Sequence, residues 1–169
     1  MGQMAQKIIK ENKDEILKLL NTAYSEEWLA YYQYWIGAQV AKGPMRKTIA
    51  DEFLEHAKEE FDHAKKVCDR IIQLGGTPVL DPEEWKKHAI CRYDAPVDEF
   101  IVTLLEQNLE AERCAIGRYQ QICNLCMSAK DIETFHVARH ILSDELDHEQ
   151  DLEDYLEDIK TSMEHMSKK

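Results

Sequence analysis

The amino-acid sequence predicts an all-α fold, a four-helix bundle with one long crossover that contains a short helix. Charged residues make up 32% of the 169 positions while Gly and Pro together fill only ten, a balance typical of long solvent-exposed helices. Apolar residues recur at helical spacing in four stretches, and only the second link between them is long. From the mass of 19.8 kDa we expect one domain over residues 1–169, with its bundle at about 12–160 and polar termini.

The first helix is expected from about residue 12 to residue 41. Its apolar stripe contains one carboxylate, Glu27, and burial of an unpaired charge is strongly unfavourable. From this helix alone, a salt bridge and a metal ligand are equally good interpretations of Glu27. Gly43 and Pro44 are expected to end the helix and to place Pro at the first turn of the next one. The stripe consists of Ile16, Leu20, Ala23, Ala30, Tyr34 and Ala38.

The second helix is expected to run to about Leu74, where the Gly-Gly-Thr-Pro segment at 75–78 ends it. Glu60 lies in the middle of its apolar face, and His63 flanks that face. His56, one turn earlier, belongs either to a secondary metal position or, as we favour, to the ordinary partly buried histidines. The apolar face consists of Ile49, Phe53, Val67, Ile71 and Leu74.

The crossover at residues 75–96 is expected to contain the short helix. Asp81 is the expected N-cap and Pro82 the first helical position, and Glu83 and Glu84 lie near the positive end of the helix dipole. About twenty residues are enough to return along a helix about 45 Å long. The third helix can therefore run parallel to the second, unlike the arrangement of a simple up-down-up-down bundle.

The third helix, at about 97–127, carries four glutamates that compete for the role of a buried ligand. The apolar face of this helix is centred close to Glu112, whereas Glu110 points nearly opposite to it. We therefore expect Glu112 to be the buried ligand, in preference to Glu99, Glu106 and Glu110. The apolar face consists of Ile101, Leu105, Leu109, Ala115, Ile116, Tyr119 and Cys123.

The fourth helix is expected to begin after Asp131, its N-cap, and its apolar face presents Glu145 and His148. His136 and His140 lie off this face, so we interpret them as surface or intersubunit residues rather than ligands. Residues 162–169 are polar and expected to be frayed. The apolar face consists of Ala138, Ile141, Leu152, Leu156 and Ile159.

A repeated pattern predicts a metal site in this bundle. The segment Glu-Phe-Asp-His at 60–63 returns as Glu-Leu-Asp-His at 145–148, and a Glu and a His three apart on a helix project from one face. A further Glu precedes each copy by 33 residues. One Glu from each of two helices and a Glu-x-x-His from each of the other two form the ligand set of a dinuclear iron or manganese site. The six ligands are Glu27, Glu60, His63, Glu112, Glu145 and His148.

Within this site we assign the bridging role to Glu60 and Glu145, and one terminal carboxylate and one imidazole to each metal. Oxygen-rich ligands with an imidazole suit iron or manganese better than copper or structural zinc. Tyr34 and Tyr119 each stand seven residues after the lone Glu of their half. Tyr34 is interpreted either as a group that forms a hydrogen bond near the site or intercepts stray oxidising equivalents, or as a packing residue.

Charge and cysteine content narrow the class of protein. The formal net charge of −12 argues against a duplex-binding surface, because nucleic-acid binding draws most of its affinity from Lys and Arg at phosphates. Residues 1–10 hold no apolar run resembling a signal peptide, and no stretch approaches the roughly 20 apolar residues of a membrane span. We therefore expect a cytoplasmic protein without membrane contact. Its five cysteines are interpreted as thiols or redox-active groups, with Cys123 and Cys126 as core or half-buried thiols.

With these ligands placed, the chain resembles the ferritin-like superfamily, and within it the bacterioferritin-related, Dps-like proteins called thioferritins. The resemblance covers about residues 12–160 and rests on the six ligands, on Leu-Gly-Gly-Thr-Pro at 74–78, and on Cys91 together with Ala-Glu-Arg-Cys-Ala at 111–115. It implies a cage of twelve subunits with two iron ions in each, manganese or zinc being possible substitutes, and no haem. It also implies that iron(II) is oxidised preferentially with hydrogen peroxide and stored as a ferric mineral, which protects the cell from oxidative stress.

The resemblance further implies a redox pair formed by Cys91 and Cys114. Cys114 follows Glu112 by two positions and so faces roughly away from the core, where the crossover can cover it. Without the resemblance, two unrelated thiols would be the favoured interpretation. The absence of a fifth short helix after Ile159 makes a shell of twelve subunits more plausible than one of twenty-four.

Two other classes of function remain open at this point. A manganese catalase or a rubrerythrin-like peroxidase would use similar ligands without storing mineral, although the sequence lacks the paired Cys-x-x-Cys segment of a rubredoxin domain. A DNA-coating Dps protein usually needs a basic terminal arm, whereas here Lys7, Lys10 and Lys13 alternate with acids and amides. We therefore treat DNA as a less favoured partner than iron(II) and hydrogen peroxide.

Overall fold

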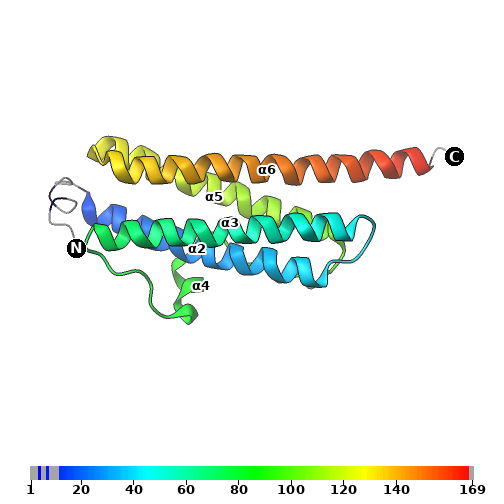
Figure 1. Cartoon of the computed structure of the whole chain (residues 1–169), viewed down its shortest axis with the longest axis horizontal. Coiled ribbons are helices and arrows are strands. Elements are labelled where there is room, and N and C mark those ends of the chain that lie inside the picture. Colours follow the sequence, from blue (N-terminus) through cyan, green and yellow to red (C-terminus); the bar gives the residue numbers. More distant parts are fainter. Residues whose placement is uncertain (1–3, 5–6, 8–11, 168–169) are drawn as a thin grey trace.

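Four long helices form the body of the protein. The computed structural model describes residues 4, 7 and 12–167, so most of the N-terminal segment at 1–10 lies outside the described residues. The long helices are α2 (Lys13–Val40), α3 (Arg46–Gln73), α5 (Ile101–Ala129) and α6 (Ile132–Ser167). Figure 1 shows them side by side, with α2 and α6 running in one direction and α3 and α5 in the other. The predicted all-α four-helix bundle, with its second and third long helices parallel, is confirmed.

The apolar core is divided into two clusters along the bundle. One contains residues such as Ile16, Ile71 and Ile122, and the other contains residues such as Phe53 and Leu105. Full burial of such side chains stabilises the fold by about 1.5–3 kcal/mol each. The clusters leave a middle layer between them, and this layer holds the predicted metal ligands.

The turn between α2 and α3 is tight and depends on Gly43. Gly43 has a φ of 122°, and a Cβ at this position would lie 2.8 Å from the Phe100 ring. Pro44 lies in this turn and not in the first turn of α3, which begins at Arg46, so that part of the prediction is wrong. Met45, with φ of 60°, takes the N-cap position and delays the helix by one residue beyond Pro44.

The crossover between α3 and α5 contains the short helical segment predicted for it. A 3-10 turn (Pro82–Glu84) continues into α4 (Trp85–His88), and the Asp81 carboxylate accepts a hydrogen bond from the Glu83 N–H at 3.0 Å. The rest of the crossover lies against α2, because Glu26 Oε1 accepts the N–H groups of Ile90 and Cys91 at 2.8 and 2.9 Å. The single long crossover is therefore also confirmed.

Two helix ends differ from the prediction. α5 begins at Ile101 and not near Val97, because residues before it extend along the α2–α3 turn: Lys42 donates its N–H to Glu99 and accepts that of Ile101. α6 continues to Ser167, so the predicted fraying from residue 162 onward is wrong. No Gly or Pro interrupts this end of the helix, and its Lys, Met and Glu residues are good helix formers.

The long helices are amphipathic and not apolar on all sides. α3, for example, has a buried face that includes Ile49, Phe53 and Val67, while most of its acids and lysines are exposed. Among the helices of the described part of the chain, none combines the length and the apolar character that a membrane crossing needs.

Candidate dinuclear metal centre

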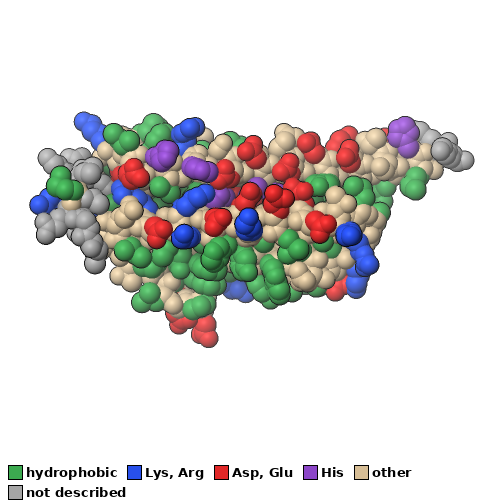
Figure 2. All heavy atoms as spheres, viewed as in Figure 1, with side chains coloured by type: hydrophobic (Ala, Val, Ile, Leu, Met, Phe, Trp, Pro, Cys, Tyr) green, Lys and Arg blue, Asp and Glu red, His purple; other side chains and the backbone are tan. Residues whose placement is uncertain are grey.

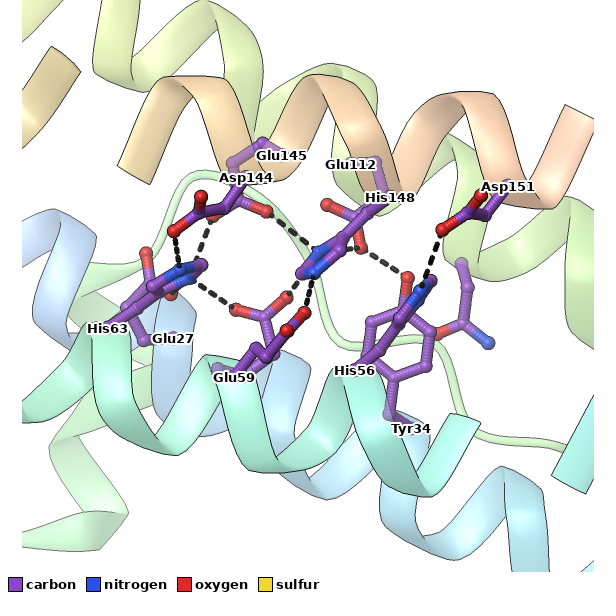
Figure 3. A network of polar contacts seen from close by, with 12 residues as sticks. Glu27, Tyr34, His56, Glu59, His63, Glu112, Asp144, Glu145, His148 and Asp151 are labelled. Atoms are coloured by element: carbon purple, nitrogen blue, oxygen red, sulfur yellow. Dashed lines mark hydrogen bonds and ion pairs between the residues drawn. The ribbon is translucent and has the colours of Figure 1, made fainter. Parts of the chain in front are cut away.

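The six predicted ligands meet in the middle layer of the bundle and come from all four long helices. All six are at most 2% exposed. Figure 3 labels five of them, all but Glu60, and shows these side chains converging between α3 and α6, with α2 and α5 behind. The members are Glu27 on α2, Glu60 and His63 on α3, Glu112 on α5, and Glu145 and His148 on α6.

The ligands form two overlapping groups of four, and each group has donor atoms within 4.8 Å of one another. Glu60 and Glu145 belong to both groups. One group is completed by Glu27 and His63, and the other by Glu112 and His148. If one metal ion were bound in each group, the two shared carboxylates would contact both ions and each remaining pair would contact one.

The hydrogen bonding of these side chains fits a bound metal. Several of their buried polar atoms have no hydrogen-bond partner, although buried polar groups in proteins are nearly always paired. Metal ions would supply the missing partners. The unpaired atoms are Glu27 Oε2, Glu60 Oε1, both carboxylate oxygens of Glu145, and the Nδ1 atoms of His63 and His148.

Each ligand histidine directs Nδ1 toward the carboxylates. His63 Nδ1 lies 3.2 Å from Glu145 Oε1 and 3.6 Å from Glu60 Oε2, while His148 Nδ1 lies 3.3 Å from Glu145 and 3.4 Å from Glu60. Burial alone lowers a histidine pKa, but the surrounding carboxylates outweigh it and raise the pKa of both side chains. The carboxylates around each Nδ1 therefore favour a positively charged group at these positions.

The outer nitrogens of the two histidines are held by carboxylates that sequence reasoning missed. His63 Nε2 lies 3.1 Å from Asp144 Oδ2, and His148 Nε2 lies 2.6 Å from Glu59 Oε2. Such outer partners fix the orientation of a ligating histidine and raise its basicity. A signal was present in the sequence, because an acid directly precedes the ligand Glu in both copies of the repeat.

Two tyrosines hold the terminal carboxylates Glu112 and Glu27, and each tyrosine comes from the opposite half of the repeat. The Tyr34 hydroxyl donates to Glu112 Oε1, and the Tyr119 hydroxyl donates to Glu27 Oε1. Tyr34 is therefore a hydrogen-bonding group at the site as well as a packing residue. Burial is the main reason that the pKa of Glu27 and that of Glu112 are raised, and it raises the pKa of both tyrosines too.

Glu60 differs from the terminal carboxylates. Burial opposes its ionisation, but the nearby His148 and His63 outweigh this effect and lower its pKa. The metal-free site thus separates a carboxylate that stays charged from two that favour protonation. This separation limits the net charge that the low-dielectric layer must hold.

Other residues considered from the sequence lie outside the centre. Glu110 is exposed and pairs with Arg113 at 2.9 Å, and Glu106, His136 and His140 are exposed as well. His56 was interpreted as partly buried, but it is only 2% exposed and its ring stacks on that of His148 at 4.1 Å. Burial, followed by the neighbouring His148, lowers the pKa of His56 to about 4.

Cys91 and Cys114 form a disulfide with a Cα–Cα distance of 5.7 Å, which ties the crossover to α5. Glu26, which accepts two backbone hydrogen bonds from the crossover, also forms an ion pair with Arg118. Arg118 Nε lies 3.1 Å from Glu26 Oε2. A cavity of about 30 Å³ separates this segment from the ligands, lined by Cys91 on one side and by carboxylates such as Glu60 on the other. The other cysteines, Cys68, Cys123 and Cys126, are free thiols.

Comparison with known proteins yields relatives of one kind. The family model of the ferritin-like domain matches residues 17–162. The chain is 38% identical over 146 residues to the "DNA protection during starvation protein" of Pyrococcus furiosus, covering 85% of this chain and 77% of that protein. It is 27% identical over 134 residues to a bacterioferritin of Rhodobacter capsulatus, covering 79% and 78% of the two chains.

Solved structures agree with these relatives. A dodecameric thioferritin, the bacterioferritin-related protein from Bacteroides fragilis, superposes with a TM-score of 0.91 at 49% identity, covering 96% of this chain and 95% of that one. Dps from Thermosynechococcus elongatus superposes with a TM-score of 0.82 at 19% identity, covering 91% and 95%, which supports the fold alone. The match of the family model over most of the chain, together with the relatives at 38% and 49% identity, shows that this chain belongs to the ferritin-like domain family.

Proposed function

We propose that this protein oxidises iron(II) at the six-residue centre, preferably with hydrogen peroxide, and stores the ferric product inside a cage of its own subunits. The observation that carries the proposal is the sharing of Glu60 and Glu145 between two four-residue groups, which gives two adjacent metal positions. Iron(II) is the substrate that this donor set suits best, since carboxylates with one imidazole per metal favour iron or manganese over copper.

The charges of the site are compatible with two ferrous ions. Four carboxylates carry −4 when ionised, against +4 for two iron(II) ions, so the loaded site is close to neutral in a buried layer. Its protons must leave as the ions enter, because ligating histidines and carboxylates are deprotonated. Glu27 and Glu112 keep their hydrogen bonds from the tyrosines, which orient one oxygen of each and leave the other for the metal.

Two irons side by side match the electron demand of peroxide. Two iron(II) ions give up two electrons, and one hydrogen peroxide with two protons takes them up to form two water molecules. Transfer of both electrons at one site avoids release of a hydroxyl radical, the product of a single-electron step. Hydrogen peroxide is small enough for the cavity of about 30 Å³ that lies between the crossover and the carboxylates.

Storage requires a shell, and we propose twelve subunits of a single-domain chain. Support comes from the Bacteroides fragilis thioferritin, which is described as dodecameric and is matched along 95% of its length. The chain also has exposed aromatic and aliphatic side chains suited to subunit contacts, on α2 at Tyr32 and Trp35 and on α3 at Leu54 and Phe61. A cytoplasmic location accords with its free thiols.

Anaerobic titration with iron(II), followed by hydrogen peroxide, tests this function. We expect two iron ions bound per subunit before oxidant is added, and one peroxide consumed for each two irons oxidised. Repeated additions should leave a ferric mineral that elutes with the protein. Peroxide decomposition to oxygen without retained iron would instead favour a manganese catalase, and peroxide reduction without mineral would favour a rubrerythrin-like peroxidase.

DNA coating is a separate possibility, which the name of the Pyrococcus furiosus relative raises. The net charge of −12 opposes it, because nucleic-acid binding draws most of its affinity from Lys and Arg at phosphates. A gel-shift titration with duplex DNA at low salt checks this point. Retardation at low protein concentration would contradict the assignment as a storage protein without DNA binding.

A further inference from the structure

The disulfide that ties the crossover to α5 lies between two hollows of different kinds. Cys91 lines the small cavity of about 30 Å³ whose other walls include Glu27, Glu60 and Glu112. Cys114 instead borders an open groove of about 670 Å³ between the crossover and α5. One half of the cystine therefore lies on the side of the metal centre, and the other half lies on the side of the surface.

The exposure of the two cysteines differs in the same way. Cys91 is only 9% exposed, whereas Cys114 is half-buried. Figure 2 shows the short helical segment of the crossover projecting from the lower edge of the molecule, and Arg92 and Asp94, next to the disulfide in sequence, are exposed as well. Thiol–disulfide exchange begins when a thiolate attacks one of the two sulfurs, and its rate depends on access to that sulfur. A thiol from solvent therefore meets Cys114 first.

The crossover is also held around Cys91 by hydrogen bonds that do not involve the sulfurs. Glu26 Oε1 accepts the N–H groups of Ile90 and Cys91 at 2.8 and 2.9 Å. Three residues further on, the Asp94 N–H donates to Gln33 Oε1 at 2.8 Å. Cleavage of the S–S bond therefore leaves the buried cysteine in place beside its partner.

We propose that a small thiol without net negative charge reduces this disulfide from the groove, by attack on Cys114 Sγ with Cys91 as the leaving group. The bond between the two protein sulfurs breaks as a bond forms between Cys114 and the incoming thiol. Cys91 leaves with the electron pair and takes up a proton. A second molecule of the thiol then attacks the sulfur of the first, which frees Cys114 and releases a small-molecule disulfide. Two thiols are thus oxidised for each protein disulfide reduced.

The lining of the groove determines the charge of the thiol that it favours. Asp94, Glu106 and Glu110 line the groove together with a single guanidinium, that of Arg92. Glu110 is also paired with Arg113, but the other two carboxylates still outnumber Arg92. A cleft of one sign raises the local concentration of ions of the opposite sign and lowers that of like ions. The volume of about 670 Å³ is that of a small-molecule site, for which about 300–1,000 Å³ is usual.

This order of attack links a reaction at the surface to the interior of the bundle. The thiol that leaves is Cys91, on the wall of the cavity that Glu27, Glu60 and Glu112 also line. A reductant in the groove thus changes a group beside the metal ligands without entering their cavity. The inference is independent of the proposed function, because none of its steps requires iron or peroxide.

Two single substitutions in the full-length, reduced protein test the order of attack. Cys91→Ser leaves Cys114 as the only thiol of the pair, and Cys114→Ser leaves Cys91. Each variant is treated with cystamine, a small cationic disulfide, because the second exchange step run in reverse labels the cysteine that the reductant attacks. Peptide mass mapping follows each cysteine separately. We expect Cys114 to be labelled at least about ten-fold faster than Cys91, owing to its access from the groove.

The same variants in guanidinium chloride are the matched control. Unfolding exposes both thiols, so their labelling rates should then agree within about two-fold. Circular dichroism checks that the untreated variants are folded, and an alanine variant replaces either serine variant that loses helical content. Equal labelling of the two cysteines in the folded protein, or faster labelling of Cys91, would overturn the proposal.

Reduction of the oxidised natural protein tests the charge of the thiol. At low salt, cysteamine should reduce the disulfide several-fold faster than 2-mercaptoethanesulfonate, after correction for their rates on 2-hydroxyethyl disulfide. Glu106→Gln should narrow this ratio, while Glu133→Gln, an exposed change at the start of α6, should not. A ratio near one for the natural protein would overturn the charge preference. Reduction by a protein dithiol alone, with no small thiol effective, would overturn the class of reductant.

Discussion

At the scale of single residues, the surroundings of a carboxylate decide whether it can serve at the centre. Glu110 and Glu112 are two positions apart on α5. The side chain of Glu110 is 75% exposed beside Arg113, while Glu112 is 1% exposed and faces both Tyr34 and His148. The same residue type thus has a solvent-exposed role in one case and a buried polar role in the other.

Replacement of Glu112 by Ala should reduce the rate of iron(II) oxidation at least about 100-fold, because loss of a group that merely orients a ligand already costs about 10- to 100-fold. Glu110→Ala is the matched control and should leave the rate within about two-fold, since an exposed ion pair contributes little. Stopped-flow absorbance gives both rates, and circular dichroism checks helical content. Equal effects of the two changes would show that the ligand on α5 is assigned wrongly.

The carboxylates that hold the histidines give a second prediction at this scale. Glu59→Gln and Asp144→Asn should each lower metal affinity about 10- to 100-fold, because the outer nitrogen of one ligand histidine loses its charged partner. Calorimetric titration with cobalt(II) measures the affinities. Asp62→Asn, at an exposed acid next to His63 in sequence, should change nothing. An effect of Asp62→Asn as large as the others would point to general loss of negative charge.

The six ligands could be predicted from the sequence because their spacing repeats and because each lies on or beside an apolar helical face. For Glu59 and Asp144 the repeat gave only their position before each ligand Glu and not their role, since a residue next to a ligand points about 100° away from it around the helix. Whether it reaches a histidine on the facing helix depends on the distance between α3 and α6. The sequence likewise placed His56 at partial burial, because its burial comes from the ring of His148 on another helix.

At the scale of elements, the helices follow their apolar patterns, but their ends depend on contacts from distant segments. The start of α5 at Ile101 reflects its backbone pairing with Lys42, nearly sixty residues earlier, which no local pattern contains. The same contact brings Phe100 against Gly43. The turn between α2 and α3 and the end of the crossover are therefore one structural unit.

A pair of glycine substitutions tests this unit. Gly43→Ala should destabilise the fold by more than about 1 kcal/mol, because its φ of 122° and the nearby Phe100 ring both disfavour a Cβ. Gly117→Ala is the control, since this exposed position in α5 has open space around it and Ala favours a helix by about 0.5–1 kcal/mol. Thermal unfolding should move down for the first and up for the second, by about 2–4 °C per kcal/mol. A stable Gly43→Ala variant would contradict the tight turn.

The disulfide of the crossover gives another prediction at this scale. Peroxide-treated protein digested without reductant should release Cys91 and Cys114 as one linked peptide pair from a single subunit, because the two lie within disulfide distance. Cys91→Ser should lower stability by about 3 kcal/mol, the entropic value for a loop of this length. Mass spectrometry and thermal unfolding measure these effects. Recovery of Cys123 joined to Cys126, or of all five thiols free during normal iron oxidation, would remove the pair from the mechanism.

At the scale of the whole molecule, the bundle accommodates a charged layer between two apolar clusters. Each cluster keeps water from one side of the layer, and the crossover covers a third side. The free-energy cost of burying so many carboxylates is offset by hydrogen bonds from the two tyrosines and by the attraction of the adjacent histidines. The arrangement of the helices could be predicted from the periodic spacing of apolar residues. The shape of the assembly could not, because it depends on contacts between the exposed surfaces of different subunits.

The assembly itself can be measured directly. Twelve subunits of 19.8 kDa predict a particle of about 240 kDa in multi-angle light scattering at moderate salt. Trp35→Glu, which places a charge on an exposed aromatic surface of α2, should shift the protein toward smaller species while α-helical content is retained. A surface lysine change such as Lys65→Glu serves as the control. A monomer or dimer for the natural sequence would contradict storage and favour a small peroxidase.

The tyrosines and outer carboxylates of each helical hairpin hold metal ligands of the other hairpin. This arrangement constrains how the sequence can evolve. Residues 27, 34, 60 and 63 each recur 85 positions later, and Glu59 is matched there by another acid, Asp144, as expected if an ancestral helical hairpin was duplicated. Yet Tyr34 and Glu59 serve ligands of the later copy, while Tyr119 and Asp144 serve those of the earlier one. Neither hairpin can therefore drift independently, and a chimera that joins one hairpin of this chain to one from a distant relative would lose the complementary groups of both. These contacts couple the two hairpins at this site, although the repeat unit is one.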